Sequence, residues 1–331
     1  MRSFVTGATG FIGGRVARLL ARERHEVVAL VRRPVAAQDL AGPGIRLHPG
    51  DITDIDSMRD GMRGADGVFH IAGWYRVGVR DSAAAERINV EGTRNVLRLM
   101  EELKVPRGVY TSTLAVFGDT HGRVVDETYR AGGPWLSEYD RTKWKAHYEV
   151  AEPMMRAGLP LVVVQPGLTY GPGDTSTLRE TLVEHLRGRL RMLPQRTAYC
   201  WGYVEDVARG HIQAMERGAV GTSYIIAGPP HTVIEAFAIA EHLTGITAPR
   251  YLIPPGLMRF AATWVRPLEN FVTVPPLFAS ETLRVMAGVT YLGSNARAVR
   301  ELGFAARPLE DGLKDTLTHE MRLLELLPRG V

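Results

Sequence analysis

A tyrosine and a lysine stand four residues apart in the stretch "SEYDRTKWK", residues 137–145. If this stretch is helical, Tyr139 and Lys143 lie on one face of the helix. The chain has four lysines against thirty-six arginines, and two of the four, Lys143 and Lys145, fall here. A phenol can protonate the alkoxide that forms when hydride adds to a carbonyl, and a neighbouring ammonium group favours the phenolate that the reverse reaction needs. The pair therefore predicts carbonyl–alcohol chemistry, with Lys143 lowering the pKa of Tyr139 and Lys145 facing solvent. The alternative is an ordinary pair on a solvated helix face.

A glycine-rich turn lies near the start of the chain, in "TGATGFIGG", residues 6–14. It follows a short apolar strand and opens a segment with the apolar spacing of a helix, "FIGGRVARLLARER". Glycine allows positive φ and a close backbone approach, and the start of a helix presents N–H groups to an anion. A strand, a glycine turn and a helix in this order predict a dinucleotide site. The residues expected to bind the dinucleotide here are Gly7, Thr9, Gly10, Phe11, Ile12 and Gly13.

The end of the second predicted strand, "HEVVALVRR", bears on which coenzyme binds. An acidic residue at this position would hold the free 2′-hydroxyl of NAD. The sequence has no acid there, and Arg32 and Arg33 follow instead. Guanidinium groups suit the 2′-phosphate of NADP, so NADP is expected in preference to NAD. Two surface arginines in an Arg-rich chain would give the same pattern.

Two further strand ends are expected to meet the cofactor. Asp51 and Ile52, in "GDITD", follow the third predicted strand and are placed to meet the adenine ring. Ala72 and Gly73, in "HIAGWY", follow the fourth and leave room for the middle of the cofactor.

Strands and helices alternate through the first half of the chain. Continuous apolar strands such as "LPLVVVQPG" between helical segments predict a parallel sheet covered on both faces. Short connections then give an α/β fold of the doubly wound, Rossmann type. Later residues are less regular and mostly helical. The expected division is a dinucleotide-binding region at 1–166 plus about 199–222, and a smaller substrate-binding cap at about 167–198 and 223–331.

Composition narrows the classes of partner. Of 331 residues, 45% are hydrophobic and 23% charged, which is typical of a globular protein. The formal net charge is +4 and the arginines are scattered, so no nucleic-acid partner is expected. No run of about 18 apolar residues occurs, so no membrane partner is expected. The hydrophobic helix predicted around 256–266 is expected to be a lid or core helix rather than one lying on a membrane. The chain begins directly with a strand, so we expect no signal peptide and a cytoplasmic location.

Cysteine and histidine usage gives no sign of a metal site. The single cysteine, Cys200, excludes an internal disulfide and a cysteine-based zinc site. The ten histidines show no metal-ligand spacing, so no metal is expected.

Taken together, the motifs resemble those of the extended short-chain dehydrogenase/reductase family, also called the NAD(P)-dependent epimerase/dehydratase superfamily. The closest likeness is to its dihydroflavonol-reductase-like branch. The resemblance covers about residues 3–211, and its pieces occur in the family's order. The matching pieces are "TGATGFIGG", "GDITD", "INVEGTRNV", "YTSTLAVFG", "YDRTK", "QPGLTYGPGD" and "YVEDVARGH".

The resemblance implies a catalytic triad of Thr113, Tyr139 and Lys143. The hydroxyl position, counted back from "VFG", falls on Thr113 rather than Ser112. It also implies that Lys143 bonds the ribose next to the nicotinamide and that Asn89 orders this region. Further expected cofactor residues are Thr111, Ser112, Pro166 and Gly167. The expected substrate-pocket residues are Trp74, Tyr75, Arg76, Thr113 and Tyr170.

Members of the family commonly pair two long helices into a dimer interface. Here these helices are predicted at about 82–104 and 138–157, and both carry apolar residues beyond what one core face needs. A homodimer is therefore expected.

Departures from the family pattern bear on the substrate. Tyr199 and Cys200 stand where nucleotide-sugar members often have an Arg-Asp pair, and Gln165 stands where many members have arginine. Both departures favour a carbonyl or alcohol substrate that is not a nucleotide sugar. Three functions stay open: an NADP-dependent ketone or aldehyde reductase, a sugar or nucleotide-sugar epimerase or dehydratase with bound NAD(P), and a non-catalytic NAD(P)-sensing protein.

Overall fold

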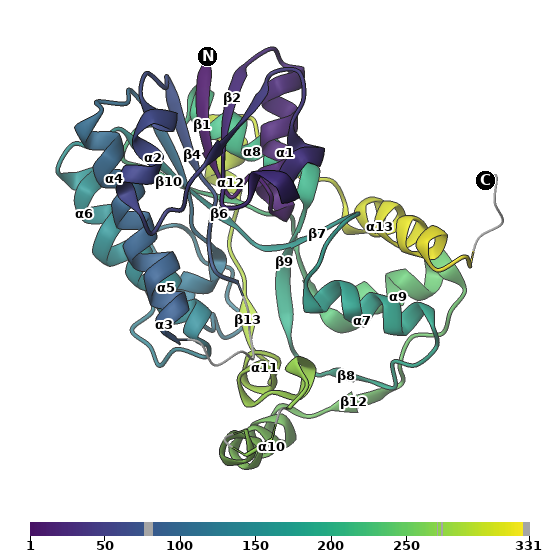
Figure 1. Ribbon diagram of the computed structural model, residues 1–331. Coiled ribbons are helices and arrows are strands. Elements are labelled where there is room, and N and C mark those ends of the chain that lie inside the picture. The colour runs from purple at the N-terminus through teal and green to yellow at the C-terminus, as the bar shows by residue number, and fades with distance from the viewer. Residues whose placement is uncertain (76–81, 270, 273, 327–331) are drawn as a thin grey trace.

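A seven-stranded parallel sheet forms the centre of the larger part of the molecule (Figure 1). The computed structural model describes residues 1–75, 82–269, 271–272 and 274–326. The strand order is β10-β6-β5-β4-β1-β2-β3, so the chain winds outward from β1 and then returns to β4 on the other side. This order confirms the doubly wound Rossmann-type prediction. The strands are β1 (Arg2–Thr6), β2 (Glu26–Val31), β3 (Ile45–Pro49), β4 (Gly67–His70), β5 (Gly108–Thr111), β6 (Leu161–Pro166) and β10 (Ser223–Ile226).

Helices cover both faces of this sheet. The central strands are apolar on both faces, and β6 is buried along its whole length. One face packs on α1 (Phe11–Arg22), α8 (Val204–Arg217) and α12 (Ala296–Leu302). The other face packs on α2 (Ile55–Met62), α4 (Gly92–Glu102), the segment Ala146–Ala151 that follows α5 (Glu138–Lys145), and α6 (Glu152–Arg156).

Shorter helical pieces extend or connect these elements. Two segments with π-helical bonding, η2 and η4, run directly into α4 and α6. The short pieces are η1 (Pro34–Leu40), α3 (Ser82–Ala85), η2 (Glu86–Glu91), η3 (Leu114–Phe117) and η4 (Ala146–Ala151).

A smaller region lies below the sheet in Figure 1, at the end where the parallel strands finish. It has its own hydrophobic core, a four-stranded sheet and a two-stranded one. Its strands are β7 (Leu168–Tyr170), β8 (Met192–Pro194), β9 (Ala198–Tyr203), β11 (Pro230–Thr232), β12 (Tyr251–Ile253) and β13 (Thr290–Tyr291). Its helices are α7 (Thr177–Leu186), α9 (Val233–Thr244), α10 (Pro255–Leu268), η5 (Pro276–Phe278), α11 (Ser280–Val285) and α13 (Leu309–Leu323).

Two expectations about the strands need correction. β9, expected in the dinucleotide-binding region, pairs with β7, β11 and β13, whereas β10, expected in the cap, forms an edge of the main sheet. The smaller region is still mostly helical, as expected. The helix around 256–266 is α10, and it is not a core helix because only Met258 and Ala262 of it are buried. Among the described residues, no helix is long and apolar enough to cross a bilayer.

Candidate active site

The glycine turn between β1 and α1 forms a tight cradle. Gly7 has a φ of +72°, and a Cβ atom on it would lie 2.6 Å from the backbone nitrogen of Ala72. A Cβ atom on Gly13 would lie 2.2 Å from the carbonyl oxygen of Gly7. Gly10 is the residue before α1, and no side chain caps the N–H groups at the start of this helix. The turn therefore fits the pyrophosphate of a dinucleotide, which needs a close backbone approach and N–H donors.

The other expected turn residues stay near the surface. Thr9 is exposed, and Phe11 and Ile12 are half-buried at the start of α1.

The ends of β2 and β3 lie beside the glycine turn at the same edge of the sheet. Arg32 and Arg33 follow β2 directly, and both are exposed. After β3, Oδ1 of Asp51 accepts hydrogen bonds from the backbone and hydroxyl of Thr53, both at 2.9 Å. Ile52 is buried. This edge therefore offers two solvent-facing guanidinium groups close to the predicted dinucleotide cradle.

The end of β4 is held by Asn89, which is buried. Its Oδ1 accepts a hydrogen bond from the backbone nitrogen of Trp74 at 2.7 Å, and its Nδ2 donates to the carbonyl oxygen of Trp74 at 3.1 Å. The same Nδ2 donates to Oγ1 of Thr142 in α5 at 2.9 Å. A Cβ atom on Gly73 would lie 3.3 Å from Asn89 Oδ1. Asn89 thus joins the turn after β4 to the helix that carries Tyr139.

Tyr139 lies in the first turn of α5, directly after the capping residue Ser137 and Glu138. Its ring makes an edge contact with the ring of Tyr75 at 4.9 Å between centroids, and it packs beside Trp74. Burial raises the pKa of Tyr139 above its usual value, and a side-chain hydrogen bond with Thr113 opposes this rise. The phenol is therefore protonated at neutral pH.

Lys143 is buried one turn further along α5. Its Nζ donates to the carbonyl oxygen of Thr111 at 2.7 Å and to the hydroxyl of Tyr110 at 3.3 Å. Burial lowers the pKa of Lys143 to about 7, because a charged ammonium group loses its hydration. The net pKa of Tyr139 is raised rather than lowered, because burial is the largest cause of its shift. That Lys143 favours the phenolate in the presence of oxidised coenzyme stays a prediction.

The three hydroxyl residues after β5 point to different partners. Thr111 Oγ1 bonds Nε2 of His211 at 2.9 Å, and Ser112 Oγ bonds Nδ1 of His147 at 2.7 Å. Thr113 is the one that reaches Tyr139. The assignment of the catalytic hydroxyl to Thr113 rather than Ser112 stays a prediction.

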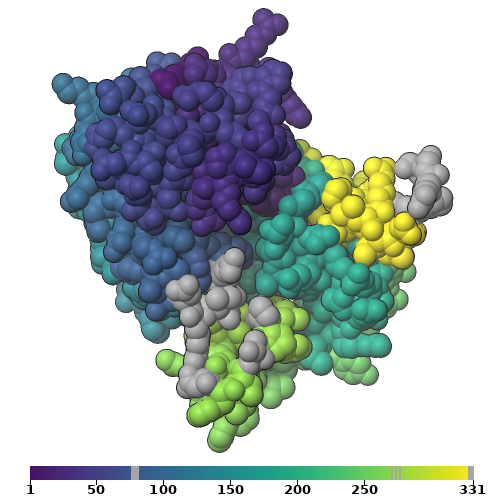
Figure 2. Space-filling view, viewed as in Figure 1, coloured from purple at the N-terminus to yellow at the C-terminus, as the bar shows by residue number. Residues whose placement is uncertain are grey.

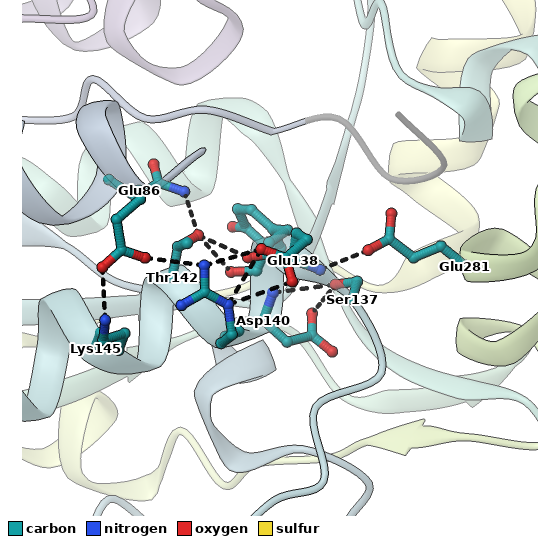
Figure 3. Close-up of polar contacts among 10 residues, drawn as sticks. Glu86, Ser137, Glu138, Asp140, Thr142, Lys145 and Glu281 are labelled. Atoms are coloured by element: carbon teal, nitrogen blue, oxygen red, sulfur yellow. Dashed lines mark hydrogen bonds and ion pairs between the residues drawn. The ribbon is translucent and has the colours of Figure 1, made fainter. Parts of the chain in front are cut away.

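A network of ion pairs fixes the outer side of α5 (Figure 3). Glu86 accepts from Lys145 at 2.6 Å and pairs with Arg141 at 2.9 Å. The carboxylate of Glu281 in α11 accepts the backbone N–H of Glu138 at 2.5 Å. Lys145 is therefore tied to Glu86, and the expectation that it simply faces solvent is wrong. No sequence pattern pointed to this pair, because its two residues lie 59 positions apart in the chain.

Asp140, next to Tyr139, forms a second link that sequence reasoning missed. Its carboxylate accepts hydrogen bonds from the hydroxyl of Ser137 at 2.8 Å and from the hydroxyl of Tyr291 in β13 at 2.9 Å. Burial raises the pKa of Asp140 to about 7. The link joins the start of α5 to the second sheet.

One expected pocket residue does not come to this site. Tyr170 is buried in the core of the smaller region, where it packs on Trp201 and Tyr203, so its assignment to the pocket is corrected. Arg76 lies outside the described residues.

The end of β6 borders the site through a crowded turn. A Cβ atom on Gly167, which follows Pro166, would lie 2.0 Å from the carbonyl oxygen of Cys200.

Within the described ranges, no group of three metal-ligating side chains could hold a metal ion.

The comparison with known families matches this architecture. A family model described as "NAD dependent epimerase/dehydratase family" matches residues 3–227, which is more than half of the chain. The chain belongs to this family. It is an NAD(P)-dependent oxidoreductase of the extended short-chain dehydrogenase/reductase type.

Three relatives align over nearly the whole chain. A provisionally named dihydroflavonol 4-reductase of Synechocystis sp. is 32% identical, over 95% of this chain and 93% of its own. Sterol demethylase protein B of Methylococcus capsulatus is 30% identical, over 92% of this chain and 93% of its own. A Stigmatella aurantiaca ketoreductase of a farnesylated dihydroquinoline oxide, 4-hydroxy-2-methyl-3-oxo-4-farnesyl-3,4-dihydroquinoline-1-oxide, is 30% identical, over 93% and 92%.

Solved structures share the fold along the whole chain. The crystal structure of gox2253 superposes with a TM-score of 0.85 at 29% identity, covering 98% of this chain and 99% of that one. A UDP-glucuronic acid 4-epimerase from Bacillus cereus, solved with NAD, has a TM-score of 0.77 at 19% identity, covering 98% and 100%. At that identity, the epimerase supports the fold alone.

Proposed function

We propose that this protein is an NADP-dependent reductase of a ketone or aldehyde on an apolar, ring-bearing molecule. The observation that carries the proposal is the state of Tyr139. Burial keeps its phenol protonated, and a phenol that holds its proton is ready to donate it to an alkoxide.

Each residue of the triad has a separate role in this proposal. NADPH, when bound, supplies the hydride. Thr113 donates a hydrogen bond to the carbonyl oxygen, which gains negative charge as the reaction proceeds. Tyr139 protonates that oxygen. Lys143, held by Thr111 and Tyr110, presents its ammonium group toward the ribose.

The dinucleotide would lie across the carboxyl ends of the strands. The cradle at Gly7 and Gly13 would hold its pyrophosphate, and Asp51 and Ile52 would border the adenine. Arg32 and Arg33, exposed after β2, support NADP over NAD because they can pair with a 2′-phosphate.

The substrate class follows from the side chains around Tyr139. Trp74 and Tyr75 offer aromatic surface within contact of its ring. At the position where nucleotide-sugar members often carry an Arg-Asp pair, Tyr199 stacks on Tyr291 and Cys200 is buried. An apolar carbonyl compound fits these neighbours better than a sugar diphosphate. The names of the sterol-related and farnesyl-quinoline relatives point the same way.

A second candidate is an epimerase or dehydratase acting on a sugar or nucleotide sugar. The description of the family favours it. Such an enzyme returns its hydride to the same substrate and so consumes no net coenzyme. The presence of Tyr139 and Lys143 in this chain argues for either enzyme over a non-catalytic NAD(P) sensor.

A paired assay separates the two candidates. The protein is incubated with NADPH and a panel of aromatic and alicyclic ketones and aldehydes, and loss of NADPH absorbance is followed. A nucleotide-sugar panel is monitored in parallel by NMR. NADPH consumption with a carbonyl compound supports the reductase. Sugar interconversion without net coenzyme turnover, and no carbonyl reduction, would reject it.

A further inference from the structure

Helix α10 presents a stripe of large apolar side chains to solvent. The stripe consists of Leu257, Phe260, Trp264 and Leu268, which are 57%, 62%, 63% and 54% exposed. Their spacing of three, four and four residues places them on one side of the helix. Phe260 and Trp264 also contact each other, with 6.1 Å between ring centroids. Monomeric proteins rarely leave so continuous an apolar surface uncovered.

The opposite side of α10 attaches it to the rest of the protein. Met258 and Ala262 are its buried residues, and Arg259 donates a hydrogen bond to the carbonyl oxygen of Ala287 at 3.3 Å. The helix lies at the lower end of the molecule, beyond α11 (Figure 1), and the same end is seen in green at the base of Figure 2. The stripe is therefore the outer surface of an anchored helix.

The segments around this stripe are strongly basic. β12 leads directly into α10 and pairs with β8, so residues 192–194 lie beside 251–253, and the flanking segments 185–197 and 246–268 meet at this pair. These two segments contain no aspartate or glutamate, although basic and acidic residues are nearly balanced over the chain, at 40 to 36. They carry seven exposed arginines: Arg187, Arg189, Arg191, Arg196, Arg250, Arg259 and Arg266. Two of these, Arg187 and Arg250, pair with Glu184 and Glu241 just outside the segments.

The combination of apolar and basic groups decides which partner fits. A second copy of the chain, related by a two-fold axis, would bring the same arginines face to face, which is unfavourable. Nucleic acid would pair with the arginines but leave the leucine, phenylalanine and tryptophan side chains without an apolar partner. A bilayer surface takes aromatic and aliphatic side chains at headgroup depth and arginines at its phosphates.

We propose that the α10 surface, defined as the apolar stripe together with Arg189, Arg191 and Arg196, docks the protein peripherally on an anionic lipid bilayer. This departs from the expectation that the protein has no membrane partner. At 14 residues, α10 is too short to span a bilayer and lies along its surface instead.

The α10 surface is also connected to the candidate active site. α10 packs on α11, and Glu281 of α11 accepts the N–H of Glu138, the residue before Tyr139. A docked molecule would therefore keep the site close to the lipid phase, where apolar substrates concentrate. The docking proposal goes beyond the proposed function and is tested without substrate or coenzyme. Failure of the docking proposal can therefore be distinguished from failure of the proposed reductase function.

The test is co-sedimentation of the full chain with vesicles. We expect binding to phosphatidylcholine vesicles that contain phosphatidylglycerol to exceed binding to pure phosphatidylcholine by about tenfold or more. Added salt should weaken it, because the headgroup attraction is screened. Phe260→Ser with Trp264→Ser should reduce binding by about tenfold, and Arg189→Gln, Arg191→Gln and Arg196→Gln together should remove the preference for the anionic lipid.

A matched control uses apolar residues that are exposed elsewhere. Val220→Ser with Val299→Ser, both 50% exposed, should leave vesicle binding within about twofold of the parent. Thermal melting confirms that each variant folds, which is expected because every changed side chain faces solvent. Equal binding by the α10 variant and the control, or no binding to either vesicle, would overturn the proposal. Light scattering that shows the α10 variant dissociating a dimer would overturn it too, because it would assign the stripe to a second copy.

Discussion

At the scale of single residues, burial rather than an ion pair sets the protonation of the candidate site. Tyr139 keeps its proton because its surroundings exclude water, and Lys143 loses affinity for its proton for the same reason. The helical spacing of the two residues was readable in the sequence. The partners of Lys143 were not, because Tyr110 and the Thr111 carbonyl come from a strand about thirty residues earlier.

The buried lysine predicts a pH dependence of stability in the coenzyme-free protein. The pKa of Lys143 is about 7 when folded, against an ordinary value of 10.5. Between these values the unfolded chain binds the proton that the folded chain lacks, so stability rises with pH. At and below pH 7 the full cost of burying the charge applies. The Tm of Lys143→Met minus the Tm of the parent should therefore be largest near pH 6 and should decrease steadily toward pH 10.

The control for this prediction is Lys145→Met, which removes a half-exposed lysine paired with Glu86. Its Tm difference from the parent should change far less over the same pH range, because Lys145 is only partly buried and pairs with Glu86. A Lys143→Met difference that is just as flat would show that Lys143 keeps an ordinary pKa in the folded chain.

Coenzyme preference also belongs to the residue scale. Arg32→Asp replaces a guanidinium group, at the end of β2, by a carboxylate that repels a 2′-phosphate and can accept a bond from a 2′-hydroxyl. We expect the parent to have a higher kcat/KM with NADPH than with NADH, and the variant to lose or reverse that preference. Arg24→Asp, at the far end of β2, serves as a control that should change nothing. Equal kcat/KM values for the two coenzymes in the parent would refute the preference.

At the scale of elements, the regular alternation of strands and helices could be predicted from the sequence. The position of individual strands and aromatic side chains in the smaller region could not. Alternating apolar strands and helices were sufficient for the doubly wound sheet, because each strand must be covered on both faces. The exchange of β9 and β10 between sheets could not be predicted, since both are short apolar strands with no distinguishing pattern. Tyr170 was misplaced for a similar reason, because an aromatic residue after a strand suits a pocket and a core equally well.

Asn89 gives an element-scale prediction, because it joins the turn after β4 to α5. Asn89→Ala removes three hydrogen bonds and leaves buried groups of Trp74 unpaired. The free energy of unfolding in denaturant should fall by about 2–3 kcal/mol. Asn95→Ala, which loses one bond to the carbonyl of Ile52, should cost about 1 kcal/mol. Losses of the same size in both variants would mean that Asn89 does not hold the two elements together.

At the scale of the whole molecule, the predicted homodimer rests on the family resemblance alone. The argument from surplus apolar residues fails, because Val96, Leu97, Leu99 and Met100 of α4 are all buried within the protomer. If α4 and α5 nevertheless pair between copies, light scattering at micromolar concentration should give about 73 kDa, twice the chain mass of 36.5 kDa. A mass near that of one chain would refute the dimer.

The central claim is that the molecule reduces a carbonyl group with NADPH through the proton of Tyr139. The most direct measurement compares the parent with Tyr139→Phe, using NADPH deuterated at the transferred position and a carbonyl substrate found in the panel. The account predicts one deuterium in each alcohol formed by the parent and one coenzyme oxidised. It also predicts a fall in kcat of about 10²–10⁴-fold in the variant with coenzyme affinity unchanged. Near-normal turnover in Tyr139→Phe, or sugar interconversion without net coenzyme oxidation, would contradict it.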